Sequence, residues 1–236
     1  MWKQNWEAFY YKAENETEAA RLNREFFTRD GITVAKALLG KVLVNKTKAG
    51  NIRGIITEVE SYMGIHDKGS HTYGGRRTER TEPMFHIGGT SYVYFTYGMY
   101  HCMNITSELA ENPQAVLIRS VIPADDVSKE LMLQNRMELQ LQKAKKRKAA
   151  KGEALEASEV KRMEKNTLKH LADGPGKMCI AMGITKTNND MDMVVAENFY
   201  VTEGIAIEPE EIKAGKRIGI DYAEEAAEYL WRFYLE

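Results

Sequence analysis

The chain has 236 residues, 43% of them hydrophobic, and a formal net charge of −1 at neutral pH. A chain of this size and apolarity can bury the core of a single domain, which excludes an intrinsically disordered protein. The near-zero net charge argues against a chain that binds nucleic acid through overall charge alone.

The sequence carries no signal for membrane insertion or secretion. No apolar run approaches the roughly 18 to 20 residues that span a bilayer, and residues 1–22 mix aromatic with charged side chains instead of forming an apolar secretory core. Cys102 and Cys179 lie far apart, without metal-ligand spacing. We therefore expect a cytoplasmic protein with reduced, buried thiols, no membrane partner and no metal.

The pattern of apolar residues predicts a mixture of helices and strands. In chain order we expect a lead-in helix within residues 1–24, a helix and then a strand in 26–44, a strand in 51–63, an arginine-rich loop in 74–90, two strands around a turn in 91–106, a strand in 114–123, charged helix broken at Gly152 in 129–168, a helix after a Gly-Pro-Gly turn in 172–184, and short strands in the tail. Because helices and strands do not alternate regularly, the predicted fold class is α+β, not a doubly wound sheet.

Two glutamates stand on the strand predicted in 51–63. Side chains alternate between the faces of a strand, so Glu58, Glu60 and Tyr62 share one face. Buried neighbouring carboxylates raise the pKa of at least one of them, which favours a general base in a pocket. The alternative is a solvated strand face on which both glutamates pair with arginine or lysine.

His66 and His71 lie five residues apart, with Asp67 between them. A zinc site needs a third ligand at a recognisable spacing, and the sequence shows none. We therefore expect hydrogen-bonding or stacking histidines instead of a metal site.

The segment SYVYFTYGMYH, residues 91–101, predicts an aromatic hairpin. Tyr92 and Tyr94 share one strand face, whereas Tyr97 falls in the turn beside Met99. Hairpin turns are normally polar because they face water. A tyrosine there suggests insertion between DNA bases, and the alternative is a hairpin whose aromatic residues pack inside the core.

Basic side chains accompany these elements. Arg76, Arg77 and Arg80 stand in a glycine-rich loop, Lys177 begins the helix after the Gly-Pro-Gly turn, and Lys186 follows it. Such groups suit phosphates, and around an aromatic hairpin they favour nucleic acid. The run KAKKRKAAK, residues 143–151, is read as a solvated helix face that could add salt-sensitive affinity.

The chain resembles the alkyladenine (3-methyladenine) DNA glycosylases of the mammalian type, as a bacterial member, from Phe26 to Tyr234. The motifs that carry the resemblance are FFTRD, AKALLGKVLV, TEVESYMG, DKGSH, GGRRTERTEPMF, GTSYVYFTYGMYHCMNI, AVLIRSVIP, DGPGKMCIAMGI and WRFYL. The fold that it implies is a single mixed domain, residues 25–236, around a curved antiparallel sheet like that of a formyltransferase C-terminal domain. A protruding β-hairpin would enter the DNA minor groove.

The resemblance also implies roles for individual residues. Glu60 corresponds to the base that activates water, Arg119 to its partner, and the backbone of Ile218 to a third water contact. Tyr62, His71, Tyr94 and Asn104 correspond to the base pocket, with Asn104 discriminating against guanine's exocyclic amino group. Tyr97 and Met99 correspond to the intercalating hairpin tip, and Arg76, Lys177 and Lys186 to contacts with the DNA backbone.

The activity implied is hydrolysis of the N-glycosidic bond of damaged purines in double-stranded DNA by a monomer, without cofactor or metal and without strand cleavage. The charged segment at about 138–168 is longer than in the mammalian members. Two alternatives remain: a nucleic-acid-binding module of the same fold without catalysis, and a carbohydrate hydrolase using Glu58 and Glu60. The second is weakened because both carboxylates lie on one strand face, not across a cleft.

Overall fold

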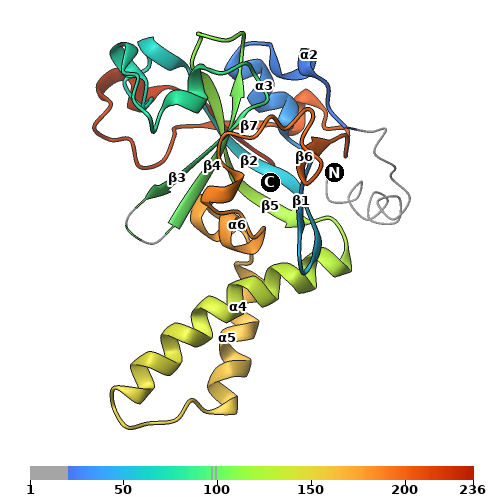
Figure 1. Ribbon diagram of the computed structural model, residues 1–236, viewed down its shortest axis with the longest axis vertical. Helices are drawn as coiled ribbons and strands as arrows, with labels where there is room; N and C mark the ends of the chain where they lie inside the picture. The colour runs from blue at the N-terminus through green and yellow to red at the C-terminus, as the bar shows by residue number, and fades with distance from the viewer. Residues whose placement is uncertain (1–20, 97, 99) are drawn as a thin grey trace.

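The computed structural model describes residues 21–96, 98 and 100–236. Tyr97, Met99 and residues 1–20, which hold most of the expected lead-in helix, lie outside the described residues. Within the described part, an antiparallel sheet of eight strands forms the centre of the molecule (Figure 1). The strands are β1 (Val42–Thr47), β2 (Gly50–Tyr62), β3 (Ser91–Thr96), β4 (Tyr100–Ser107), β5 (Gln114–Pro123), β6 (Phe199–Thr202), β7 (Lys213–Gly215) and β8 (Arg232–Tyr234).

The long strand β2 holds the sheet together. The main strand order is β3-β4-β5-β2-β1-β6, and β8 pairs with both β2 and β7. The first half of β2 pairs with β1, while its second half has β5 on one edge and β8 on the other. The predicted α+β fold with a curved antiparallel sheet is confirmed, and the hairpin of β3 and β4 projects from the sheet (Figure 1).

Alternation along the strands gives the sheet two chemically different faces. On one face, Met103, Ile118 and Val59 lie in register across three strands and are fully buried in the main core. Three helices of the described part cover that face. Helix α3 (Gly31–Leu38) and helix α4 (Asp126–Ala149) lie on β2, and helix α6 (Pro175–Ala181) lies on β4 and β5. The opposite face carries the tyrosines and the carboxylates that the sequence singled out.

Local sequence signals explain the helices α2 (Arg24–Phe27) and α3 (Gly31–Leu38). The Asp30 carboxylate accepts hydrogen bonds from the N–H groups of Ile32 and Thr33, which caps the N-terminus of α3. After α3 the chain turns at Gly40, whose φ of 80° suits glycine. The predicted helix and following strand are therefore confirmed.

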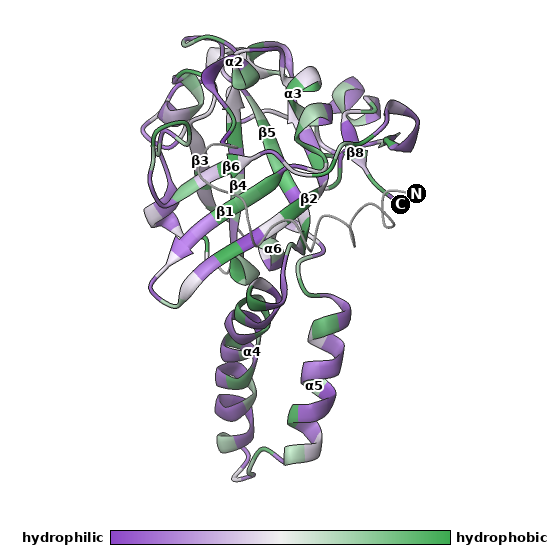
Figure 2. Cartoon of the chain, turned by 90° about the vertical axis from the view of Figure 1, so that its right-hand side faces the viewer, coloured by the Kyte–Doolittle hydropathy of each residue, from purple (hydrophilic) through white to green (hydrophobic). Residues whose placement is uncertain are grey.

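Helices α4 (Asp126–Ala149) and α5 (Ala157–Lys169) form an arm that extends away from the body and is mostly hydrophilic (Figures 1 and 2). At the base of the arm, Asn135 donates from Nδ2 to the carbonyl of Ala181 at 2.9 Å, an ordinary hydrogen-bond distance. Further out, Gln140 bonds Thr167 of α5 at 2.9 Å. The break predicted at Gly152 falls within the connection between the two helices.

Helix α6 (Pro175–Ala181) lies against the sheet beside the base of the arm. Pro175 opens it, where a missing N–H costs nothing because the first N–H groups of a helix have no partner inside it. In the described part of the chain no helix is both long and apolar enough to cross a membrane.

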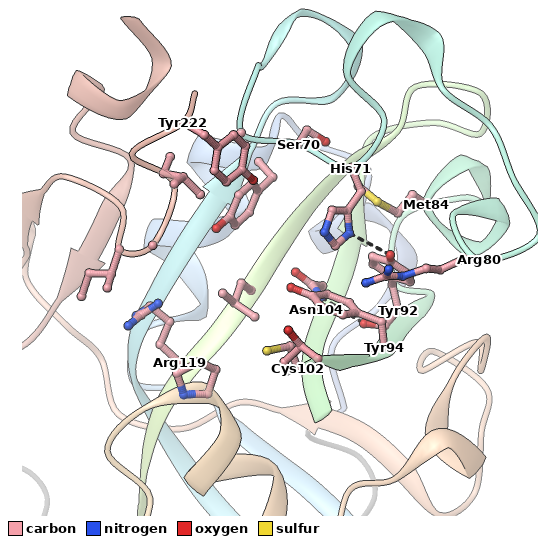
Figure 3. Close-up of a pocket in the computed structure, with 18 residues that line it drawn as sticks. Ser70, His71, Arg80, Met84, Tyr92, Tyr94, Cys102, Asn104, Arg119 and Tyr222 are labelled. Atoms are coloured by element: carbon pink, nitrogen blue, oxygen red, sulfur yellow. Dashed lines mark hydrogen bonds between the residues drawn. The ribbon is translucent and has the colours of Figure 1, made fainter. Parts of the chain in front are cut away.

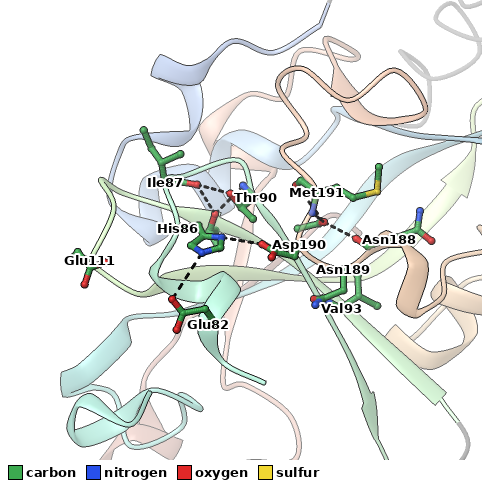
Figure 4. Close-up of polar contacts among 12 residues, drawn as sticks. Glu82, His86, Ile87, Thr90, Val93, Glu111, Asn188, Asn189, Asp190 and Met191 are labelled. Atoms are coloured by element: carbon green, nitrogen blue, oxygen red, sulfur yellow. Dashed lines mark hydrogen bonds and ion pairs between the residues drawn. The ribbon is translucent and has the colours of Figure 1, made fainter. Parts of the chain in front are cut away.

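The segment 188–191 covers the outer edge of β3 (Figure 4). Ser91 donates from its hydroxyl to the carbonyl of Asn188 at 2.6 Å, and the N–H of Val93 donates to Oδ1 of Asn189 at 2.8 Å. The N–H of Ser91 also donates to the Met191 carbonyl at 2.9 Å, and the N–H of Met191 donates to the Ser91 hydroxyl at 3.0 Å. An edge strand is otherwise open to unwanted pairing, so this segment both protects β3 and fixes its position.

Asn189→Ala should lower the free energy of unfolding by about 1 to 3 kcal/mol, because the Val93 N–H would lose its partner in a half-buried position. Urea unfolding measures the change. Asn166→Ala, at an exposed position on α5, is the control and should change little. Equal stability of the Asn189→Ala protein and the wild type would contradict this account of the edge.

Candidate active site

The face of the sheet opposite the main core holds a pocket of about 220 Å³ (Figure 3). Its floor is formed by Tyr92 of β3, Asn104 of β4 and Leu117 of β5, which lie in register. The same row continues to Glu60 of β2, outside the lining. The pocket is lined by Tyr62, Gly69, Ser70, His71, Arg80, Met84, Tyr92, Tyr94, Thr96, Cys102, Asn104, Leu117, Arg119, Pro175, Ile218, Gly219, Ile220 and Tyr222.

Glu60 ends this row, directly behind the pocket wall. Its side chain is 0% exposed, and its carboxylate has three donors. Oε1 accepts from the N–H of Ile218 at 2.8 Å and lies 3.1 Å from Nη1 of Arg119, while Oε2 accepts from the hydroxyl of Tyr62 at 2.9 Å. Because these three donors line the pocket and Glu60 does not, they connect the buried carboxylate to the space in front of it.

Arg119 reaches both glutamates because the pairing of β2 with β5 is irregular. Between the pairs Ile56–Val121 and Val59–Ile118 the register shifts once on each strand, which leaves Arg119 without a residue directly opposite. Such a bulge changes the direction of a side chain. The Arg119 guanidinium lies 3.0 Å from Glu58 through Nε and 3.1 Å from Glu60 through Nη1.

The two glutamates have different environments. Glu58 is partly exposed and is also bonded by Nη1 of Arg232, from β8, at 3.0 Å. Glu58 therefore fits structural pairing, and the idea that the whole strand face is solvated is wrong for Glu60. Burial raises the pKa of Glu60 above its ordinary 4.5, and the bonds from Arg119, Ile218 and Tyr62 oppose that rise. A buried carboxylate with a raised pKa is a stronger base than one in water.

A buried ion pair fixes the loop that supplies the Ile218 N–H. The side chains of Arg217 and Asp67 are both 0% exposed and are joined by two bonds of 2.5 and 2.7 Å. Arg217 also donates to the carbonyls of Ser61 and Ala226 at 3.0 and 3.1 Å, so it ties β2 to the C-terminal segment. Its guanidinium lies 4.7 Å from the centre of the Tyr62 ring.

Aromatic rings form the wall across the pocket from Arg119 (Figure 3). The centres of the His71 and Tyr94 rings are 4.7 Å apart, those of Tyr92 and Tyr94 are 5.2 Å apart, and Tyr92 and His71 share a hydrogen bond of 2.9 Å. Arg80 lies over the Tyr94 ring at 5.0 Å. Asn104 donates from Nδ2 to the Tyr92 carbonyl at 3.1 Å, which fixes its amide at the pocket floor.

The histidine of this wall is neutral at neutral pH. Burial, together with the positive charges of Arg80 and Arg76, lowers the pKa of His71 to about 4. Burial raises the pKa of Tyr92 to about 12, so its hydroxyl keeps its proton. The wall therefore offers uncharged aromatic surfaces with polar edges.

The structure brings together Glu60, Arg119, Ile218, Tyr62, His71, Tyr94 and Asn104 around one pocket. The candidate contacts with the DNA backbone lie outside it. Arg76 borders an adjoining hollow with Lys68 and Arg80, Lys177 is half-buried and pairs with Asp173 at 2.8 Å, and Lys186 borders a third hollow beside Phe95. Tyr97 and Met99, the expected hairpin tip, lie outside the described residues.

The sequence did not reveal the Arg217–Asp67 pair, the place of Arg80 over Tyr94, or Cys102 and Tyr222 in the lining. Asp67 stood out only as the residue between two histidines, and the contact with Arg217 spans 150 positions.

Within residues 21–96, 98 and 100–236, no three His, Cys, Asp or Glu side chains are grouped so that they could hold a metal ion. That no cofactor is required stays a prediction.

Comparison with known proteins gives consistent matches over most of the chain. The sequence model of a family described as methylpurine-DNA glycosylase (MPG) matches residues 25–236. A protein of Clostridium novyi (strain NT) named "Putative 3-methyladenine DNA glycosylase" is 47% identical over 221 residues, which cover 92% of this chain and 95% of the relative. Proteins with the same name from Clostridium acetobutylicum and Desulfitobacterium hafniense (strain Y51) are 44% and 42% identical, each over 216 residues, and cover 92% of this chain and 94% and 95% of their own lengths.

Asp67→Asn should lower the free energy of unfolding by about 3 to 5 kcal/mol, because the buried Arg217 would lose its compensating charge. Glu82→Gln, which removes a partner of the exposed Arg77, is the matched control and should change stability little. Urea unfolding compares the two variants. A loss for Asp67→Asn no larger than that for Glu82→Gln would contradict the role assigned to the buried pair.

The raised pKa of Glu60 predicts a pH dependence of stability. The folded state binds this proton more tightly than the unfolded state does, so the resulting stability is full below the unfolded-state pKa and is lost as pH rises through the raised folded-state pKa. Glu60→Gln cannot titrate. The free energy of unfolding of the variant, minus that of the wild type, should therefore grow as pH rises above about 4 and then level off. Urea unfolding at a series of pH values measures it, and a difference that is constant with pH would disprove the raised pKa.

Proposed function

The chain belongs to the methylpurine-DNA glycosylase family, and from that premise we propose that it is a monofunctional hydrolase that flips damaged purines out of duplex DNA and releases them. Membership of this family supports the general activity, which is hydrolysis of the N-glycosidic bond of 3-methyladenine in DNA. The proposal adds the wider substrate class, alkylated or deaminated purines such as 7-methylguanine, hypoxanthine and ethenoadenine, and the roles of the residues around the pocket.

The observation that carries the proposal is the position of Glu60. This buried carboxylate stands behind a pocket whose opposite wall is aromatic, and Arg119 and the Ile218 backbone stand between it and the pocket. A purine between the rings would present its glycosidic bond to a water molecule held at Arg119 and Ile218. Glu60, when ionised, takes a proton from that water as it attacks the sugar carbon.

The charge of Glu60 also acts on the transition state. Breaking an N-glycosidic bond develops positive charge on the sugar ring, as in glycoside hydrolysis. A fixed carboxylate in a site with little water stabilises that charge more strongly than it would in bulk solvent. Hydroxide from the attacking water ends on the sugar, its proton passes to Glu60, and the bonding electrons leave with the base. A cationic base leaves as the neutral purine, whereas a neutral base leaves as an anion that takes a proton from water, and the other product is an abasic site.

The pocket wall recovers part of the cost of base flipping. A base stacked in a duplex cannot be reached, and glycosylases are among the enzymes known to extrude the target nucleotide at a cost of a few kcal/mol. Stacking on aromatic side chains is worth about 1 to 3 kcal/mol per base, and Tyr62, His71 and Tyr94 supply such rings. Alkylated purines are often cationic, which adds a cation–π attraction to the tyrosines.

The remaining roles complete the proposal. Tyr97 and Met99 intercalate into the DNA, and Tyr97 fills the gap left by the extruded base. Asn104 discriminates against the exocyclic amino group of guanine, and Arg76, Lys177 and Lys186 contact the DNA backbone. We propose that the protein acts as a cytoplasmic monomer without a cofactor, on residues 25–236 as one domain preceded by a lead-in segment.

Glu60→Gln should slow base release by about 10²- to 10⁴-fold, the usual contribution of a general base, while binding of lesion DNA stays nearly unchanged. The assay measures abasic sites, revealed by alkali, in oligonucleotides carrying hypoxanthine, ethenoadenine or methylated purines. Glu58→Gln is the matched control on the same strand, and it should lose much less because Glu58 is held by Arg119 and Arg232 away from the lining.

Two outcomes would count against the proposal. Wild-type protein that binds lesion DNA but releases no base would favour the alternative, a nucleic-acid-binding module without catalysis. Equal losses in Glu60→Gln and Glu58→Gln would mean that the two carboxylates act only through Arg119. Strand cleavage without alkali would contradict a monofunctional enzyme.

A further inference from the structure

The outer half of α4 carries an unusual concentration of positive charge. Residues 143–151 contain six lysines or arginines and no acidic residue. Lys143, Lys146 and Arg147 stand at i, i+3 and i+4 of the helix, so they share one face, and all three side chains are exposed. We call these three residues the α4 stripe.

The α4 stripe begins beside the projecting hairpin. Nζ of Lys143 lies 5.9 Å from the centre of the Tyr100 ring, and Tyr100 is the first residue of β4, directly after the turn. Two helical turns before Lys143, on the same face, Arg136 is buried against the body. The stripe therefore continues the body-facing side of α4 outward, past the hairpin and along the free part of the arm (Figure 1).

The charges of the α4 stripe are not balanced within the described protein. Lys148 pairs with Glu153 and Glu159, whereas Lys146 and Arg147 have no ion pair there. Like charges three and four residues apart destabilise a helix. Attraction of cations to a helix C-terminus accounts for the last turn of α4, but Lys143 stands before that turn. A polyanion lying along the stripe would relieve the repulsion.

We propose that the α4 stripe binds the phosphate backbone of the duplex that carries the lesion, on the side of the hairpin where the arm extends. This inference rests on the proposed function, because it takes the hairpin turn as the part that enters the DNA. The partner is duplex DNA flanking the damaged nucleotide, and the contact is with phosphates, without regard to base sequence. The arm would thus lengthen the DNA footprint beyond the pocket.

A second basic row on the arm provides a matched control. Lys161, Lys165 and Lys169 repeat every four residues along α5 and are exposed. Val160 and Thr167 lie on the other side of this helix, where Thr167 bonds Gln140 of α4. These lysines therefore point away from α4, and they carry the same charge as the α4 stripe without bordering the hairpin.

The test compares three full-length proteins: wild type, the triple variant Lys143→Gln, Lys146→Gln, Arg147→Gln, and the triple variant Lys161→Gln, Lys165→Gln, Lys169→Gln. Fluorescence anisotropy measures the Kd of each for a duplex with a central tetrahydrofuran abasic analogue, over a series of salt concentrations. Each phosphate contact that is lost makes the slope of log K against log salt less steep by about 0.9. The slope of the α4 variant should therefore be less steep than that of the wild type by about 2.7. When salt rises from about 50 to about 200 mM, the affinity of each protein falls by some factor. That factor should be about 40 times smaller for the α4 variant than for the wild type.

The rate of base release at saturating lesion DNA, measured in a single turnover, separates this inference from the proposed function. Both variants should keep the wild-type rate, since neither row touches the pocket. An α4 variant with the wild-type salt slope would overturn the inference, as would an α5 variant with an equal loss of slope, because net charge alone would then explain the binding. If no protein released base, the proposed function would fail, and the salt slopes would still decide whether the α4 stripe binds DNA.

Discussion

Burial of the Glu60 carboxylate beside the Arg119 guanidinium is the interaction on which the rest of the site depends. Taking a carboxylate out of water is costly, and a paired charge with further hydrogen bonds offsets that cost. Glu60 has Arg119, the Ile218 N–H and the Tyr62 hydroxyl, yet burial still raises its pKa. The balance leaves a carboxylate that is held in one orientation and remains a usable base.

The sheet positions that carboxylate by register. Tyr92, Asn104, Leu117 and Glu60 are directly opposite one another across four strands, so the aromatic wall and the acid are separated by two strands and cannot shift independently. The irregular pairing of β2 with β5 lets the side chain of Arg119 reach both Glu58 and Glu60, which regular pairing would not allow. The segment over β3 and the buried Arg217–Asp67 pair fix the two ends of this row.

Much of the fold follows from local sequence, whereas the site depends on contacts between distant residues. Strand alternation places Glu58 and Glu60 on one side, and the apolar spacing in α3 and the β-branched start of β2 predict these elements with small errors in their ends. Alternation alone does not show that Glu60 is buried while Glu58 is partly exposed, because Glu60 alone is bonded by the distant loop at Ile218. Nor does a sequence show a register shift in the pairing of β2 with β5, or a bond between residues 67 and 217. The resemblance to a known family supplied the grouping of these residues, and their roles in the reaction remain proposals.

The central claim is that an ionised Glu60 takes a proton from the attacking water, and the pH dependence of a single turnover tests it most directly. If the claim is correct, the rate of base release by the wild type rises with pH through a pKa above the ordinary carboxyl value of 4.5 and then becomes constant, because the base must be ionised. The residual rate of Glu60→Gln should lack that rise. A wild-type rate that does not change across this range, or a variant that keeps the same rise, would show that another group activates the water.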